Sequence, residues 1–202
     1  MGRRGARRAA THPPDTLLRS AVAPYLGFVL QIRGTVDHEA RDFTVGIGPT
    51  AQATHDVHAG HTVTGFAEPV VHPQLESCEF YKVSGLRVVS VREVGDATPP
   101  WRGRPPGLAV YRARGHRRLD ARTYTTHCRP CVWGCRMPVE LIVDQWNPQR
   151  RQFRVETFCY GPKSCPLYRA GPTRQVPGRR GMRWTEEDWI DDEATAHRGP
   201  DE

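Results

Sequence analysis

Apolar and polar residues alternate along the stretch from Tyr25 to Val94, and this period-two pattern predicts β-strands. Gly, Pro and charged residues separate four segments rich in β-branched and aromatic residues: YLGFVLQIRGTVD, DFTVGIGP, AGHTVTGFAEPVV and EFYKVSGLRVVSVREV. Glycines inside these segments, among them Gly34, Gly65 and Gly85, are typical of bulged and strongly coiled strands. The pattern therefore predicts a small, strongly curved sheet.

The residues before this sheet follow a different pattern. Residues 1–14 are rich in Arg and Ala and predict a flexible basic arm. DTLLRSAVAPYLG then predicts a short helix with Asp15 as its N-cap and Pro24 near its end.

The second half of the chain begins with a loop rich in Pro and Gly, GDATPPWRGRPPG, which suits neither a regular helix nor a central strand. LAVYRARGHRRLDARTYTTH predicts two short strands around GHRR, and MPVELIVDQWNPQRRQFRVETF predicts a hairpin with NPQRR as its turn. No apolar run approaches the ~20 residues that a bilayer-spanning helix needs. The basic start lacks the apolar region of a secretory signal, so we expect a cytoplasmic protein without a membrane partner.

Five of the six cysteines flank the predicted hairpin, in CRPCVWGC before it and CYGPKSC after it: Cys128, Cys131, Cys135, Cys159 and Cys165. Two cysteine clusters joined by a hairpin are typical of a zinc ribbon, in which a tetrahedral ion usually takes two thiolates from each side. Four of the five suffice, so one is spare. The first pair is either Cys128 with Cys131 or Cys131 with Cys135, and His127 is an alternative ligand.

Clustered cysteines have other uses, which stay open as alternatives. An iron–sulfur cluster also takes four thiolates, although this spacing fits neither common ferredoxin pattern. A disulfide framework is typical of secreted proteins, and unliganded cysteines pack into apolar cores. We expect structural zinc for the clusters and a core position for the isolated Cys78.

Charge is unevenly distributed along the chain. The net charge is +7, but residues 1–183 hold 28 basic and 14 acidic side chains, and residues 184–202 hold eight acidic side chains and one arginine. A basic body favours polyanionic partners, because phosphates that bind Lys and Arg release counterions. We expect this acidic tail to be solvated. If it instead folds back onto the basic body, it would compete with a polyanion for the same arginines.

The most basic stretch of the body interleaves arginines with aromatic residues. Such a stretch suits a phosphate track with stacking platforms for bases. The candidate nucleic-acid contacts are the arginines Arg112, Arg114, Arg117, Arg118 and Arg122 and the aromatic residues Tyr81, Tyr111 and Trp133. The alternative is an edge hairpin whose charges only prevent aggregation.

Two phrases in the first half resemble the OB-fold family. VHAGHTVTGFAEPV is similar to the x-x-G-x-x-V-x-G turn that leads into the third strand of many OB-fold domains, and EFYKVSGLRVV resembles their closing strand. The resemblance covers residues 25–94 and implies a five-stranded Greek-key barrel whose open face often binds oligonucleotides or oligosaccharides. HPQLESC gives no sign of the helix usual between strands 3 and 4, so a different small barrel stays open.

The last third resembles the C-terminal part of bacterial proteins that pair an OB-fold-like barrel with a cysteine-rich, zinc-ribbon-like segment. The phrase that carries this resemblance is ETFCYGPKSCPLYRAGPTRQVPGRRGM with the acidic residues after it, and it implies a fold but no activity. The expected protein is mainly β and has five parts: a flexible basic arm at 1–14, an OB-like barrel at 15–94, a Pro/Gly loop at 95–107, a basic hairpin with a zinc-ribbon-like module at 108–183 and an acidic tail at 184–202.

The sequence holds no G-x-S-x-G, phosphate-binding glycine loop or dinucleotide fingerprint. We therefore expect a non-catalytic protein that binds single-stranded DNA or RNA and holds a structural zinc ion. One alternative is a protein-interaction scaffold or partner subunit of an enzyme complex, since OB-like and zinc-ribbon chains also accompany acyl-CoA enzymes, with the ribbon first. A second alternative is an iron–sulfur or thiol redox protein that uses the surplus cysteine.

Overall fold

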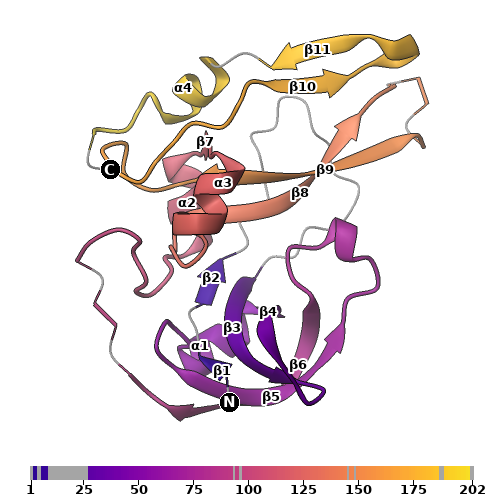
Figure 1. Ribbon diagram of the computed structural model, residues 1–202. Helices are drawn as coiled ribbons and strands as arrows, with labels where there is room; N and C mark the ends of the chain where they lie inside the picture. The colour runs from indigo at the N-terminus through magenta and orange to yellow at the C-terminus, as the bar shows by residue number, and fades with distance from the viewer. Residues whose placement is uncertain are drawn as a thin grey trace.

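The structure, a computed structural model, describes residues 2–3, 6–8, 27–92, 94–95, 97–144, 146–147, 149–186 and 189–200. The protein is mainly β, as the sequence predicts, and the described strands form three sheets (Figure 1). In Figure 1 the N-terminal sheet lies below and the C-terminal strands, orange to yellow, lie above it. None of the described helices has the length or the apolar character that a membrane-spanning helix requires. The helix predicted from Asp15 lies outside the described residues.

Four strands make up most of the N-terminal sheet: β3 (Phe28–Val36), β4 (Glu39–Ile47), β5 (Thr62–Pro69) and β6 (Phe80–Ser90). They confirm the four predicted segments, except that β4 begins at Glu39, three residues before the predicted segment DFTVGIGP. β3 and β4 form a hairpin through Asp37 and His38, whose φ angles of 49° and 67° are those that a two-residue type I′ turn needs. β4 is parallel to β6, and β6 is antiparallel to β5.

Alternate residues of these strands face one core, because side chains of a strand point to opposite faces of the sheet in turn. Its buried members are Phe28, Leu30, Ile32, Phe43, Val45, Ile47, Val57 and Leu86. Complete burial of one such side chain stabilises the fold by roughly 1.5–3 kcal/mol before the loss of chain entropy. The apolar positions of the alternating sequence pattern are therefore the residues that form this core.

Two short strands from the start of the chain complete the sheet. β1 (Gly2–Arg3) pairs with β5 and, at the one pair Arg3 and Arg33, with β3, whereas β2 (Ala6–Arg8) pairs with β3. These residues are strands where the composition predicts a flexible arm. The order is β1-β5-β6-β4-β3-β2, and the described strands do not close into a barrel.

Irregular pairing bends the hairpin of β5 and β6. The register shifts three times between Thr62 and Glu68, as the glycine pattern predicts. Helix α1 (Pro49–His55), which the sequence pattern did not indicate, connects β4 to β5. A 3₁₀ turn, η1 (Pro73–Leu75), lies in the HPQLESC segment between β5 and β6.

Helix α2 (Leu108–Arg114) corrects the prediction of two strands around GHRR, of which only β7 (Arg117–Arg118) is a strand. Leu, Ala and Arg favour a helix, and Gly115, with a φ of 64°, ends it. Tyr111 fixes the helix to the module: it is 1% exposed and its hydroxyl donates to the Val132 carbonyl at 2.6 Å. Tertiary packing of one aromatic side chain thus outweighs the β pattern of the segment.

A second short helix leads to the cysteines. Asp120 caps α3 (Ala121–Thr123) by accepting a hydrogen bond from the Thr123 N–H at 2.7 Å, and this helix runs on into the π-helix η2 (Tyr124–Cys128). The antiparallel strands β8 (Gly134–Ile142) and β9 (Arg151–Cys159) follow, and they confirm the predicted hairpin. β7 pairs with the other edge of β9.

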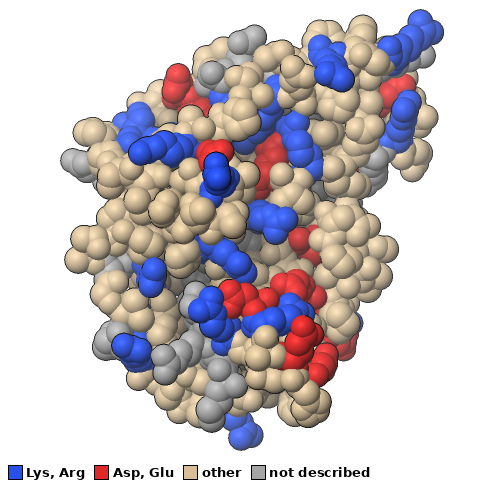
Figure 2. All heavy atoms as spheres, viewed as in Figure 1, with Lys and Arg blue, Asp and Glu red and all other residues tan. Residues whose placement is uncertain are grey.

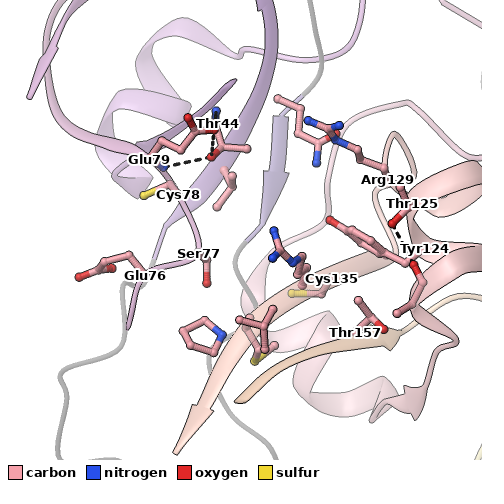
Figure 3. Close-up of a pocket in the computed structure, with 18 of the residues that line it drawn as sticks. Thr44, Glu76, Ser77, Cys78, Glu79, Tyr124, Thr125, Arg129, Cys135 and Thr157 are labelled. Carbon is pink, nitrogen blue, oxygen red and sulfur yellow. Dashed lines mark hydrogen bonds between the residues drawn. The ribbon is translucent and has the colours of Figure 1, made fainter. Parts of the chain in front are cut away.

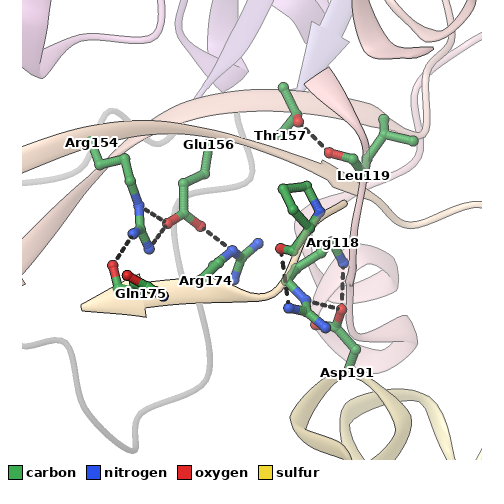
Figure 4. Close-up of polar contacts among 9 residues, drawn as sticks. Arg118, Leu119, Arg154, Glu156, Thr157, Arg174, Gln175 and Asp191 are labelled. Atoms are coloured by element: carbon green, nitrogen blue, oxygen red, sulfur yellow. Dashed lines mark hydrogen bonds and ion pairs between the residues drawn. The ribbon is translucent and has the colours of Figure 1, made fainter. Parts of the chain in front are cut away.

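A further hairpin, β10 (Arg174–Pro177) with β11 (Arg183–Glu186), is joined to β9 by charged groups. The buried carboxylate of Glu156 on β9 pairs with the guanidinium groups of Arg154 and Arg174 (Figure 4). Two partners of opposite charge offset the cost of burying this carboxylate.

The segment after this hairpin packs on the module and corrects the prediction of a solvated tail. In α4 (Trp189–Thr195), Asp191 accepts hydrogen bonds at 2.8 Å from the backbone N–H and the Nε of Arg118 (Figure 4). The Arg198 guanidinium donates to the carbonyls of Tyr160 and Gly161. Residues 189–200 are therefore part of the C-terminal module, because they supply the counter-charge of a buried arginine.

Candidate functional site

Four of the five clustered cysteines line one small cavity at the end of the β8–β9 hairpin: Cys128, Cys131, Cys159 and Cys165. The cavity measures about 10 Å³, which is the room of about one water molecule. Pro100 and Trp101 of the Pro/Gly loop and Tyr168 also line it. The four thiols therefore share one small space.

Backbone turns shape the first cysteine pair. The Cys131 N–H donates to the Cys128 carbonyl at 3.0 Å, and the Gly134 N–H donates to the Cys131 carbonyl at 3.2 Å. A Cβ atom at Gly134 would lie 2.5 Å from the Cys128 carbonyl oxygen, so only glycine fits here. The glycine after the first pair thus keeps the turn tight enough to point both cysteines at the cavity.

The second pair lies in a longer loop. The Gly161 N–H donates to the Cys159 Sγ at 3.4 Å, and the Cys165 N–H donates to the Pro162 carbonyl at 3.2 Å. A backbone N–H that donates to a sulfur atom, as that of Gly161 does, stabilises the charge of a metal-bound thiolate. The six-residue spacing between Cys159 and Cys165 therefore still brings both side chains to the same cavity.

The Cys159 thiol is buried in this arrangement. Burial raises the pKa of Cys159, and the nearby Arg117 and the Gly161 N–H only partly offset it. None of the six cysteines forms a disulfide, and the described side chains do not form a ready group of three or more metal ligands. Binding of an ion would displace the protons of the thiols that hold it.

The other two cysteines lie elsewhere. Cys135 is buried among Tyr111, Met137 and Phe158 in the core of the module. Cys78 packs with Val29 in the N-terminal half, as its isolation in the sequence predicts, and burial raises its pKa to about 11. The structure therefore separates Cys135 from the four cysteines of the cavity.

Three of the five predicted arginine contacts are engaged within the protein. Arg114 donates to the Tyr160 carbonyl and lies over the Trp133 ring. Arg117 donates to the Pro162 carbonyl and lies 3.8 Å from the centre of the Tyr168 ring, and Arg118 pairs with Asp191. These side chains hold the cysteine loop and the C-terminal segment in place, and they do not form a continuous phosphate track.

The remaining predicted contacts are dispersed. Arg112 and Arg122 are exposed, on α2 and α3 respectively. Tyr111 is buried, so its ring offers no surface for stacking. Trp133 is half-buried between Tyr111 and Arg114, and Tyr81 is half-buried on β6. The structure therefore does not bring the predicted aromatic residues together.

A cleft of about 630 Å³ separates the N-terminal sheet from the β8–β9 hairpin (Figure 3). Figure 3 shows Thr44 and the segment from Glu76 to Glu79 on one side and Tyr124, Thr125 and Arg129 on the other. Arg136 of β8 also lines the cleft. Figure 2 shows positive and negative side chains close together around the hollowed middle of this face.

Two arginines of this cleft, Arg129 and Arg136, were missed by the sequence reasoning. They follow Cys128 and Cys135 directly, so the signal was an arginine next to a cysteine in both parts of CRPCVWGCR. Within the described part of the chain, neither guanidinium group has a hydrogen-bond or ion-pair partner. Each is therefore available to an anion that enters the cleft.

Comparison with family models, with curated proteins and with solved structures finds no match to the chain.

Proposed function

We propose that this chain is a non-catalytic protein that binds single-stranded nucleic acid in the cleft between its two halves, and that a structural zinc ion holds the C-terminal half together. The observation that carries the proposal is the pair of unpartnered arginines, Arg129 and Arg136, in a cleft of ligand size. Cavities of 300–1,000 Å³ are typical of ligand sites. Phosphate is the ligand group that guanidinium binds best.

The pairing of the N-terminal strands supports an OB-like assignment. β1 pairs with β5 and, at one residue pair, also with β3, so these two strands approach each other across β1 without closing the sheet. Five strands in such an arrangement, with one parallel pair, are compatible with a partly open Greek-key barrel, a fold that often binds oligonucleotides. The cleft lies against β3 and β4 of this sheet, which contribute Gln31 and Thr44.

Zinc is supported by the four cysteines around one small cavity. Four thiolates are a common ligand set of structural zinc, and four cysteines line this one cavity. Cys128, Cys131, Cys159 and Cys165 are the proposed ligands, and Cys135 is the spare thiol. Metal analysis of purified protein with an absorption spectrum tests this assignment: we expect a colourless protein with one zinc per chain. A brown protein with iron would instead support the iron–sulfur alternative.

Binding is tested by titrating labelled RNA and DNA oligomers at two salt concentrations and following fluorescence anisotropy. Affinity should fall with salt with a log–log slope of about −0.7 per phosphate contacted. Replacement of both Arg129 and Arg136 by Gln removes two contacts, so the slope should become shallower by about 1.4.

A matched control variant carries Gln at Arg150 and Arg180, which are exposed arginines outside the cleft. It loses the same two charges but should keep the slope of the unmodified protein. Equal changes in the two double variants, or no binding near physiological salt, would overturn the proposal.

The scaffold alternative is favoured by exposed apolar side chains on and beside β5 and β6. Phe66 and Val71 are 79% and 73% exposed, and Val89 and Val91 are also exposed. Phe66 is the most exposed of these four side chains, so its ring is the group that a partner protein would cover. This reading predicts no oligonucleotide binding near physiological salt and a stable protein complex that the Phe66→Ser variant loses.

A further inference from the structure

The two walls of the cleft carry opposite charge. Arg129 and Arg136 lie on the side of the β8–β9 hairpin, and Glu76 and Glu79 lie on the side of the N-terminal sheet. Phosphates bound by the arginines cannot also approach the carboxylates, because like charges repel. A strand in the cleft therefore turns its phosphates to one wall and its bases to the other.

The two carboxylates differ in what they are free to bind. Glu79 is engaged: it accepts hydrogen bonds from the Thr44 N–H, the Thr44 hydroxyl and Arg41. Glu76 accepts no hydrogen bond from the described residues, although the His72 side chain attracts its charge. It directly follows the 3₁₀ turn η1, which ends at Leu75, so its backbone position is fixed by a turn of regular structure.

The surroundings of Glu76 favour a hydrogen bond from a ligand to its carboxylate. Burial raises the pKa of the Glu76 carboxyl group, and His72 opposes this shift. A partly desolvated carboxylate gains more from a hydrogen bond than an exposed one does, because water competes less. A ligand that brings two N–H donors would satisfy both oxygens at once.

Guanine is the base that carries two such donors side by side. Its N1–H and 2-amino group lie next to each other on the Watson–Crick edge, the edge that proteins read in unpaired bases. Cytosine and adenine offer one amino group beside an acceptor, and uracil and thymine offer one N–H between two acceptors. A carboxylate accepts two parallel donors in the geometry that it also uses with Arg.

We propose that Glu76 makes the cleft selective for guanine in a single strand, with Arg129 and Arg136 holding the adjacent phosphates. This inference rests on the proposed function, since it needs a strand in the cleft. Ser77, next to Glu76, and Gln31 of β3 also line that wall. They add neutral polar groups and no further negative charge that would repel the strand.

The test compares three labelled 12-nucleotide DNA strands: thymine only, thymine with three separated guanines, and the same strand with inosine in place of guanine. Separation of the guanines prevents four-stranded structures. Inosine lacks only the 2-amino group, so it removes one of the two donors. We expect the guanine strand to bind about tenfold more tightly than the inosine strand, in line with one bidentate contact to a base.

The Glu76→Gln variant should bind guanine and inosine strands with equal affinity, because an amide offers a single acceptor oxygen. The Glu39→Gln variant is the matched control, since Glu39 is exposed at the start of β4 and outside the cleft, and it should keep the preference. Thermal unfolding of both variants checks that they fold like the unmodified protein.

The outcomes separate the two proposals. Salt-dependent binding that Arg129 and Arg136 control, with equal affinity for guanine and inosine strands, would overturn guanine selectivity and leave the proposed function standing. A guanine preference that survives in Glu76→Gln would overturn the assignment to Glu76. Absence of binding to all three strands would overturn the proposed function and, with it, this inference.

Discussion

Cys135 and Cys159 lie on neighbouring strands, and yet their thiols have different surroundings. The register pairs Cys135 with Phe158 and Gly134 with Cys159, so the two cysteines are offset by one position and point to opposite faces. One face is the apolar core and the other is the small cavity with three further cysteines. Strand register thus separates the Cys135 thiol from the small cavity.

The first prediction compares these two thiols. Cys159→Ser should lower the zinc content of the purified protein from one per chain towards zero, because hydroxyl is a poor ligand for this ion. Cys135→Ser should retain zinc, although a hydroxyl in an apolar core costs stability. Zinc is measured by a chromogenic chelator after denaturation. Equal zinc contents in the two variants would contradict the proposed ligand set.

His116 is a buried imidazole between the rings of Phe158 and Tyr160. Burial lowers its pKa from 6.5 to about 4; Asp191 raises the pKa, and Arg174 lowers it further. Because the unfolded chain takes up this proton at a higher pH, it binds more protons than the folded chain between these two pKa values. The free energy of unfolding therefore falls as pH is lowered through this window.

The second prediction follows from this sign. Lowering the pH from 6.5 to 4 should cost the C-terminal module up to about 3 kcal/mol through His116 alone. His116→Phe keeps an aromatic ring and should weaken the pH dependence, whereas His127→Gln, at an exposed position, should not. Denaturant unfolding at several pH values measures the free energy of unfolding of each variant as a function of pH. An unchanged dependence in His116→Phe would show that other groups control acid unfolding.

At the scale of elements, α4 acts on β7 through one charge pair. Arg118 and Asp191 are both largely buried, and the same carboxylate oxygen accepts from the Arg118 backbone N–H. Removal of one partner leaves a buried charge without its counter-charge, which is far more costly than the loss of a surface pair. The ion pair with Arg118 therefore fixes α4 to β7.

The third prediction uses two adjacent acids of α4. Asp191→Asn should lower the free energy of unfolding by about 3 kcal/mol, because Arg118 loses its counter-charge. Asp192→Asn removes the same charge at an exposed position and should change stability by less than about 0.5 kcal/mol. Denaturant titration distinguishes them. Similar losses in both variants would mean that the net charge of the segment matters and the pair does not.

At the scale of the molecule, the two halves have separate cores. The buried cluster of the N-terminal sheet shares no member with the clusters around Tyr111 and Tyr124. The cysteine cavity belongs only to the C-terminal half and to the loop before it. Loss of a metal ion should therefore act on one half of the protein.

The fourth prediction is a thermal unfolding curve with two transitions. A zinc chelator should lower the midpoint of one transition and leave the other unchanged, because binding energy of the ion is folding energy only for the half that holds it. Calorimetry with and without chelator measures both midpoints. A common shift of both transitions would contradict this prediction, because it would show that the two halves unfold together.

Local patterns in the sequence predicted the strands that pair with near neighbours. The β8–β9 hairpin follows from alternation and turn residues, since these act over few residues. The strands of the β3–β4 hairpin follow from alternation, but its turn at Asp37 and His38 was not predicted. Contacts between distant residues were not predictable in this way. Tyr111 with Val132 and Asp191 with Arg118 depend on the fold as a whole, and they decide the structure of α2 and of residues 189–200.

The candidate site shows the same division. Spacing alone indicated that four of five cysteines converge, but the strand register was needed to separate Cys135 from the others. Charge alone indicated a basic surface, but three of the predicted arginines bind backbone carbonyls or Asp191. An arginine seen in a sequence does not reveal whether its partner is a ligand or the protein itself.

The pairing of Arg118 with Asp191 also sets an order of events during synthesis. The ribosome makes β7, β8 and β9 before it makes residue 191, so the nascent module has a guanidinium group to bury and no carboxylate to receive it. The N-terminal sheet needs no residue beyond β6 and is able to fold first. A chain whose translation stops before α4 would therefore carry one complete half and one half whose buried guanidinium group lacks its counter-charge.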